Sequence, residues 1–348
     1  MPVKILTVVG ARPQFIKAAP VTSAITARAG IEELLVHTGQ HFDGEMSDVF
    51  FDELGIPAPH HNLNIHGGGH GEMTGRMMIA LEPVMAEEKP DAVLVYGDTN
   101  STLAGALVAA KLEVPFAHVE AGLRAFQPIP EEINRVVADR LSRWLFCPTE
   151  ASVKNLFEEG VKANVHRVGD VMYDAVLRVR ERAKQKSDIL KRLELESGEF
   201  RLATVHRAEN TDIAESLSKV LNYLKDAGRE LPVVLPLHPR TRKAARKFEQ
   251  SLESEGLIVT DPVGYLDMAA LLDGCSSVMT DSGGLQKEAY FYGKPCVTLR
   301  DATEWVETVD AGWNRLWRGA DYLPRKTIAE YGDGDAAEKI VDILIKEA

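Results

Sequence analysis

Three acidic residues, Asp98, Glu120 and Glu131, lie on or just after the ends of neighbouring apolar runs. Carboxylates that a fold brings together in a cleft raise one another's pKa values, which makes them candidates for a general base and a general acid. Taken alone, each acid is more typical of a solvated loop, and Glu131 follows Pro130, where a helix dipole favours an acid. The three therefore predict proton-transfer chemistry if the fold places them together.

Cationic side chains occupy similar positions after other apolar runs. The chain has 40 Lys and Arg against 52 Asp and Glu, a net charge of −12, which disfavours a nucleic-acid partner. Locally concentrated cations can still hold an anionic small molecule, and a diphosphate suits such a cluster. The cations are Arg12, Lys17, His206, Arg207, His238 and Arg240.

The turn Ser282-Gly283-Gly284 is a candidate phosphate site. It follows an apolar run and precedes a helix-like segment, and the free N–H groups at a helix N-terminus face anions. Ordinary helix capping by Ser282 is the alternative. The sequence has neither a GxxxxGK[ST] loop nor a GxGxxG after its first apolar run, so those nucleotide sites are not indicated.

All these residues follow short apolar runs that alternate with helix-period segments. Runs that are apolar on both faces are typical of strands buried in a parallel sheet, and the amphipathic segments between them predict crossover helices. The predicted strands cover residues 3–9, 34–37, 92–96, 115–119 and 144–147, then 202–205, 233–237, 257–259, 277–279 and 295–299. Because ligands of such sheets bind beyond the carboxyl ends of the strands, these polar strand ends predict an active site.

Length and composition predict two globular domains. The chain has 348 residues, 45% of them hydrophobic, and a very polar stretch at 182–199 separates two α/β series. We therefore predict two doubly wound Rossmann-like α/β domains with the site in an interdomain cleft. Apolar runs are too short for a membrane span, no signal peptide is recognised, and three distant cysteines indicate free thiols, so we expect a cytoplasmic protein.

Residues 60–70 contain four histidines. Metal binding is not favoured because the segment has no HExxH pattern and no nearby cysteine. A flexible glycine-rich loop over the cleft is the preferred interpretation, and we predict no metal and no other cofactor.

Eight motifs occur in the order found in non-hydrolysing UDP-N-acetylglucosamine 2-epimerases, and the chain resembles that family from about residue 3 to about residue 312. The motifs are GARPQFIK, TGQHFD, YGDTNSTLAGA, HVEAGLR, PEEINR, HRAEN, HPRTRK and DSGGLQKEA. The resemblance implies a GT-B-type arrangement and a homodimer. It assigns residues 1–170, joined by a C-terminal helix at about 335–348, to the first domain and residues 171–334 to a UDP-binding domain.

The resemblance also implies a reaction that needs neither NAD nor metal. UDP leaves the sugar to give 2-acetamidoglucal and is then added back with carbon 2 inverted, which interconverts UDP-GlcNAc and UDP-ManNAc. The catalytic residues implied are Asp98, Glu120, Glu131, His206 and Lys17. The carboxylates would jointly remove and return the proton, and a cationic His206 would assist departure of UDP.

Further positions match residues that bind the UDP-sugar in the family. Arg135 matches an arginine close to the sugar, and Glu288 matches an acid on the ribose hydroxyls. The full set is Arg12, Arg135, His238, Tyr265, Ser282, Gly283 and Glu288.

The chain departs from the family pattern at two places. Some bacterial members bind a second UDP-GlcNAc as an activator beside residues matching Gln40, His41 and Arg207, but Asp43 stands where such members often carry Gln. This difference weakens the expectation of an activator site.

The second departure is Trp305, which replaces the arginine of a common TERPE motif. The variant TEWVE resembles the branch acting on UDP-2,3-diacetamido-2,3-dideoxy-glucuronate, whose carboxylate could meet Arg76 or Arg300. This substrate is the alternative to UDP-GlcNAc. A packing role for Trp305 alone is equally consistent with the sequence.

Other classes of function stay open at this point. A GT-B-type glycosyltransferase would share the phosphate turn but would not explain three acids in the first domain. The complete set of catalytic residues argues against a silent UDP-sugar-binding regulator. A hydrolysing epimerase is a minor variant.

Overall fold

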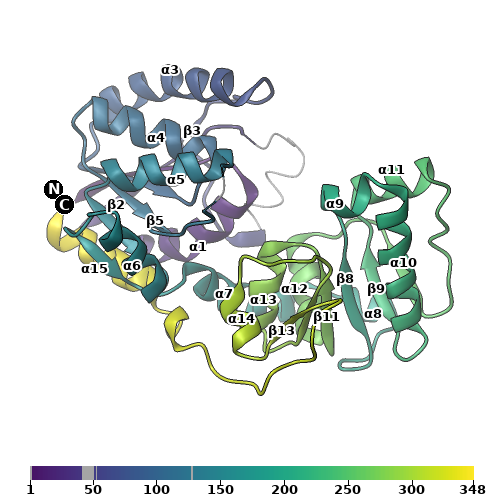
Figure 1. Ribbon diagram of the computed structural model, residues 1–348. Helices are drawn as coiled ribbons and strands as arrows, with labels where there is room; N and C mark the ends of the chain where they lie inside the picture. Colours follow the sequence, from purple (N-terminus) through teal and green to yellow (C-terminus); the bar gives the residue numbers. More distant parts are fainter. Residues whose placement is uncertain (1, 41–50, 52, 127) are drawn as a thin grey trace. The chain divides into compact units, whose positions relative to one another are not determined.

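The computed structural model describes residues 2–40, 51, 53–126 and 128–348. The chain forms two compact units, each an α/β sandwich (Figure 1). Unit 1 contains Met1–Leu177 and Ala329–Ala348, and unit 2 contains Arg178–Ile328. The division between the units after Leu177 falls within helix α7 (Val171–Lys186). The predicted boundary at 170/171 instead assigns the start of α7 to the second domain.

Unit 1 is built on a parallel sheet of seven strands in the order β3-β2-β1-β4-β5-β6-β7. All five residues of β4 are buried, as expected for a strand with helices on both faces. The strands are β1 (Val3–Val9), β2 (Ile31–His37), β3 (His61–Asn62), β4 (Ala92–Tyr96), β5 (Phe116–Val119), β6 (Trp144–Cys147) and β7 (Val165–Arg167). The sequence prediction missed β7 and also β3, which lies inside the segment interpreted as a flexible loop.

The helices of unit 1 cover the two faces of this sheet. Helices α3, α4 and α5 lie side by side on one face, and α15 packs against α1 (Figure 1). Their bounds are α1 (Arg12–Thr26), α3 (His70–Glu88), α4 (Asn100–Lys111), α5 (Pro130–Leu141), α6 (Glu150–Glu158), η1 (Ala329–Tyr331) and α15 (Ala336–Glu347). Arg28, which follows α1, forms ion pairs with Glu338 and Asp342, and these tie the C-terminal helix to this unit.

Unit 2 has a parallel sheet of six strands in the order β10-β9-β8-β11-β12-β13. The strands are β8 (Arg201–Thr204), β9 (Val233–Pro236), β10 (Leu257–Thr260), β11 (Ser277–Thr280), β12 (Cys296–Thr298) and β13 (Asn314–Leu316). The helices are α8 (Ile189–Arg192), α9 (Ala208–Thr211), α10 (Ala214–Gly228), α11 (Pro239–Lys247), α12 (Tyr265–Gly274), α13 (Gly283–Phe291) and α14 (Val306–Asp310). Two doubly wound units confirm the predicted α/β class.

Each sheet reverses its strand order at one point. In unit 1 the chain moves outward from β1 to β2 and β3, then returns to place β4 on the other side of β1. Unit 2 repeats this with β8, flanked by β9 and β11. Because neighbouring crossovers leave in opposite directions there, a crevice for ligands opens at the carboxyl ends of β1 and β4 and of β8 and β11.

Candidate active site

The switch point of unit 1 carries two of the predicted acids. Glu120 follows β5 with φ +70°, an uncommon conformation for a residue with a side chain. It pairs with Lys17 of α1, and both side chains are largely buried. A Cβ on Gly97 would lie 3.2 Å from Glu120 Oε2 and 3.3 Å from Lys17 Nζ, so glycine there, with φ +60°, leaves the space that this ion pair uses.

Asp98 lies in the next turn and is held from α5. Its carboxylate pairs with Arg135, which also contacts Glu132 Oε2 at 2.9 Å. Asn134 Nδ2 donates to the Asp98 carbonyl at 2.9 Å. Burial lowers the pKa of Arg135, but the negative charges of Asp98, Glu132 and Glu120 outweigh it, and the pKa is raised. Asp98 and Glu120 therefore share one cationic neighbour.

Glu131 and Arg12 lie in first turns of helices that begin at this edge. Glu131 is exposed on α5, one turn before Arg135 and so on the same helix face. Arg12 is the exposed first residue of α1. Among the ion pairs of the described residues, Glu131 has no direct contact with Asp98 or Glu120.

A buried network that the sequence analysis did not single out supports these two turns. His118 of β5 is completely buried, with Nδ1 2.7 Å from Asp139 Oδ1 and Nε2 2.7 Å from the Gly97 carbonyl oxygen. Both ring nitrogens therefore face an oxygen within the chain. Asp139 Oδ2 accepts from Gly122 N at 3.2 Å and from Arg124 at 2.8 Å.

The charge on Asp139 fits this arrangement. Burial alone would raise its pKa, but the hydrogen bond from His118 and the charges of His118 and Arg124 outweigh burial, and the pKa is lowered. One buried carboxylate thus joins the Gly97–Asp98 turn, through His118, to the turn that contains Glu120. The signal in the sequence was the His of HVEAGLR, which lies inside a strand and therefore looked like core.

The switch point of unit 2 carries His206 and the phosphate turn. His206 follows β8, and Asp281 follows β11, directly before Ser282. Ser282 caps α13 by accepting from Leu285 N at 3.4 Å, and its own N–H donates to Thr280 Oγ1 at 2.9 Å. This is the N-terminal geometry that suits an anion.

His206 lies among charges of both signs. Burial lowers its pKa, Asp281 raises it, and Arg207 and Arg240 lower it, so the pKa lies below the usual value. The ring of His238 lies 5.3 Å from that of His206. In the free chain His206 is therefore mostly neutral at pH 7, and the expected cation requires a bound anion.

Gly283 is the position in the phosphate turn with the least space. A Cβ there would lie 2.2 Å from Glu304 Oε1 and 3.6 Å from Trp305 Nε1. The Trp305 ring lies over Lys287 Nζ at 4.3 Å, and its buried Nε1 has no hydrogen-bond partner among the described residues. Trp305, which replaces the arginine of the TERPE motif, therefore lies beside the phosphate turn, and its indole N–H has no acceptor among the described residues.

The other residues of unit 2 that were predicted to bind the UDP-sugar lie on, or directly before, helices that begin at the same edge of the sheet. Tyr265 is the buried first residue of α12, and Glu288 lies on α13 beyond the phosphate turn. His238 caps α11, its Nδ1 accepting from Arg240 N at 3.1 Å.

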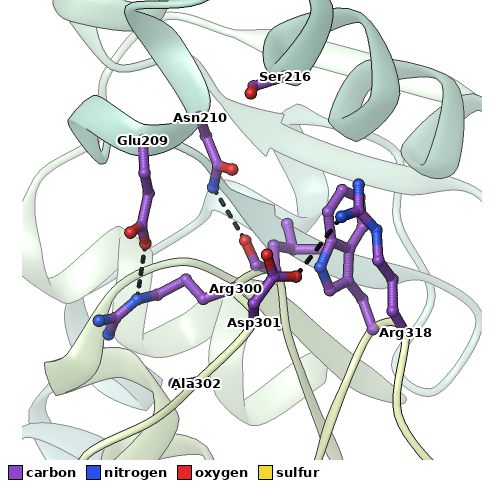
Figure 2. Close-up of a pocket in the computed structure, with 9 residues that line it drawn as sticks. Glu209, Asn210, Ser216, Arg300, Asp301, Ala302 and Arg318 are labelled. Atoms are coloured by element: carbon purple, nitrogen blue, oxygen red, sulfur yellow. Dashed lines mark hydrogen bonds and ion pairs between the residues drawn. The ribbon is translucent and has the colours of Figure 1, made fainter.

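A cavity of about 230 Å³ lies in unit 2, lined by residues of α9, α10 and the loops after β12 and β13. Arg300 lines it, with Nε 2.7 Å from Glu209 Oε1 (Figure 2). Its Nη1 also lies 2.8 Å from Glu304 Oε2. Arg76 donates to the carbonyls of His66 and Gly67. Both arginines suggested for a substrate carboxylate therefore have partners within the chain.

The residues suggested for an activator are only partly described. Gln40 Oε1 accepts from Ser101 N at 3.0 Å and Ser101 Oγ at 2.7 Å, which commits its amide oxygen to the start of α4. His41 lies outside the described residues. Arg207 is exposed in unit 2.

Two further features of the chain concern membranes and metals. Through the part of the chain that the structure describes, every helix is too short or too polar to cross a bilayer. Over the same residues, His, Cys, Asp and Glu form no group of three or more suited to a metal ion.

Comparison with known proteins gives consistent matches over the whole chain. A family model described as UDP-N-acetylglucosamine 2-epimerase matches residues 23–345. UDP-2,3-diacetamido-2,3-dideoxy-D-glucuronate 2-epimerase of Pseudomonas aeruginosa is 51% identical, with 99% of each chain covered. A UDP-N-acetylglucosamine 2-epimerase homolog of Methanococcus maripaludis is 49% identical, with 98% of this chain and 99% of that one covered.

A solved structure agrees in fold. Methanocaldococcus jannaschii UDP-GlcNAc 2-epimerase, crystallised in complex with UDP-GlcNAc and UDP, has a TM-score of 0.85 and 39% identity. The match covers 99% of this chain and 100% of that one.

Proposed function

The chain belongs to the UDP-N-acetylglucosamine 2-epimerase family of isomerases, and we propose that it inverts carbon 2 of a UDP-2-acetamido sugar by elimination and re-addition of UDP. The observation that carries this proposal is the acidic cluster of unit 1. Asp98 and Glu120 lie at one switch point, each paired with a cation, and both are near Arg135. Acids placed in this way suit proton transfer at carbon.

The reaction breaks two bonds to the sugar. The carbon 2 proton goes to a carboxylate of unit 1, and the electron pair of that C–H bond forms a double bond between carbons 1 and 2. The bond from carbon 1 to the diphosphate oxygen breaks with its electron pair on UDP. The proton at carbon 2 is barely acidic, so stabilisation of the leaving diphosphate supplies much of the rate. The N-terminus of α13 and His206 provide it, and the reverse steps return the proton on the other face.

His206 gains its proton when the diphosphate binds. The pKa of its imidazole is lowered in the free chain by burial, and a diphosphate beside it adds negative charge that raises the pKa. The imidazolium then donates to the departing oxygen. This role places proton transfer at carbon in unit 1 and leaving-group chemistry in unit 2.

UDP-GlcNAc and UDP-ManNAc are the first substrate pair we propose. The family description and the relative crystallised with UDP-GlcNAc support them.

UDP-2,3-diacetamido-2,3-dideoxy-glucuronate is the second candidate, and two observations favour it. The relative named for that substrate is 51% identical. The buried indole N–H of Trp305 beside the phosphate turn also has no acceptor among the described residues, and a second acetamido group of a substrate would supply one.

Kinetics with both nucleotides test the substrate. We would measure kcat/KM for each with the wild type, Trp305→Arg and Trp305→Phe. If the diacetamido sugar is the substrate, the wild type prefers it, Trp305→Arg reverses the preference and Trp305→Phe weakens it by about tenfold, the value of one hydrogen bond. If the ratio of kcat/KM between the two nucleotides is the same in all three proteins, Trp305 is a packing residue and UDP-GlcNAc is favoured as the substrate.

We also propose a cytoplasmic homodimer. Ile79 of α3 and Ile133 of α5 are large, exposed apolar side chains on helices that flank α4, and such residues are often covered in an assembly. Light scattering after gel filtration distinguishes dimer from monomer, and replacing both isoleucines with Asp should give the monomer if this surface is the interface.

A further inference from the structure

Asp281 is a completely buried acid at the switch point of unit 2. It follows β11 and precedes the phosphate turn, and no role was predicted for it from the sequence. The carboxylate faces the segment after β8 rather than its own helix, and three N–H donors and one ring nitrogen of His206 lie around it.

The contacts all come from the His206 loop. The backbone N–H of His206 donates to Oδ1 at 3.1 Å and Oδ2 at 3.0 Å, and that of Arg207 donates to Oδ2 at 2.9 Å. Asn210 Nδ2 donates to Oδ2 at 3.0 Å. His206 Nδ1 lies 3.4 Å from Oδ1. A carboxylate is the side chain of this size that accepts all of these, since a carboxamide replaces one acceptor with a donor.

We propose that Asp281 is the positioning residue of His206: it fixes the backbone of the catalytic loop and holds the ring with Nδ1–H toward the carboxylate. Nε2 is then the ring atom that exchanges a proton with the ligand. The role of this atom in turnover rests on the proposed function, whereas the orientation of the ring does not.

The exposure of His206 supports this division of its ring. Its side chain is 34% exposed although the facing carboxylate is inaccessible to solvent. Only the edge away from Asp281 can reach a ligand.

Other charges around His206 shift its pKa in the direction opposite to the shift that Asp281 causes. Arg207 and Arg240 lower its pKa, and His238 is its ring neighbour. Arg240 itself pairs with Asp212 at 2.9 Å. Asp281 is the charge that favours the protonated form of His206, so its removal should make the imidazolium less stable.

The direct test is ¹⁵N NMR of the histidine rings in the intact chain, with His206 assigned from His206→Asn. In the wild type at high pH, we expect the proton on Nδ1 and a bare Nε2. In Asp281→Asn, we expect a lower pKa for His206 and a mixture of tautomers. Asp139→Asn is the matched control, because it changes an equally buried carboxylate that does not contact His206, and it should leave the His206 titration unchanged.

Kinetics then test whether the orientation matters for turnover. Asp281→Asn should lower kcat about 10- to 100-fold, the value of a hydrogen bond to a charged group, while the Kd for UDP changes less than about threefold. The alkaline limb of the kcat profile should move to lower pH, because less His206 stays protonated. A merely structural role would change folding and UDP binding together and leave the pH profile in place.

The two proposals fail in different ways. A bare Nδ1 in the wild type, or an unchanged His206 titration in folded Asp281→Asn, would overturn the positioning role whether or not the protein is an epimerase. If Asp281→Asn does not fold, the tautomer in the wild type still decides the question. Absence of turnover with correct tautomer and titration would count against the proposed function alone.

Discussion

The two units each place a histidine against a buried aspartate at a strand end, but the two histidines differ in exposure. His118 is 0% exposed and both of its ring nitrogens have partners, Asp139 and the Gly97 carbonyl. His206 has one nitrogen near Asp281 and a side chain that is 34% exposed. The same residue pair thus holds two loops together in unit 1 and presents a proton carrier in unit 2.

This difference in exposure is accompanied by a difference in the chemistry that the two units can support. In unit 1 the histidine is internal, and the groups left at the edge are Asp98, Glu120 and Lys17, which suit proton transfer at carbon. In unit 2 the buried acid is internal, and the groups left at the edge are His206 and the α13 N-terminus, which suit a diphosphate. Both members of the pair in unit 1 are buried, whereas in unit 2 only Asp281 is buried and His206 keeps an accessible edge.

The largest effect is expected from the acids of unit 1. Asp98→Asn and Glu120→Gln should each lower epimerisation by about 10²- to 10⁴-fold, because each removes a candidate proton carrier. UDP affinity, measured by calorimetry, should stay within about threefold of the wild type. More than a tenth of the wild-type rate in both variants would show that these carboxylates do not carry the proton.

A comparison of His118→Asn with His206→Asn tests whether the two histidines have different roles, one in stability and one in turnover. His118→Asn should lower the free energy of unfolding by about 3 kcal/mol, because it removes one partner of a buried charged network. His206→Asn should leave stability nearly unchanged and lower kcat by about 10²-fold. Urea unfolding and steady-state kinetics measure the two, and the reverse pattern would contradict the assignment.

The pH dependence of UDP binding sharpens the assignment of His206. Its pKa is lowered in the free chain and should rise in the complex, so binding takes up a proton and affinity falls as pH rises between the two values. The fall should be at most about tenfold per pH unit. Calorimetry in buffers of different ionisation enthalpy measures the uptake, and His206→Asn serves as the control for protons that UDP itself binds.

The smallest effect concerns two adjacent glycines of α13. Gly283→Ala should weaken UDP binding by about tenfold, roughly 1.4 kcal/mol, because a Cβ 2.2 Å from Glu304 Oε1 forces that side chain to move. Gly284→Ala is the control, since the nearest atom to its Cβ would be Ser282 Oγ at 4.0 Å. Equal effects of the two changes would argue that Glu304 moves freely.

Strand positions could be predicted well because buried parallel strands are continuous apolar runs. The predicted runs 3–9, 92–96 and 144–147 are β1, β4 and β6. The two-residue strand β3 was missed because it is too short to show a pattern. The polar stretch 182–199 was predicted as a linker, but α7 extends to Lys186 and α8 forms within it.

The residues at the strand ends were predictable, but the acids behind them were not. Asp98, Glu120 and His206 each follow an apolar run, so position along the chain identified them. Asp139 and Asp281 lie 21 and 75 residues from the histidines that they hold. The packing of α5 brings Asp139 to His118, and the pairing of β8 with β11 brings Asp281 to His206.

The most direct test of the account is proton NMR of UDP-GlcNAc, and separately of the diacetamido nucleotide, incubated with the protein in deuterated water. We expect one of them to form its carbon 2 epimer with deuterium at carbon 2 and no free sugar. Asp98→Asn should abolish the exchange while UDP still binds. Folded wild-type protein that binds UDP but exchanges no proton in either nucleotide would contradict the proposed reaction.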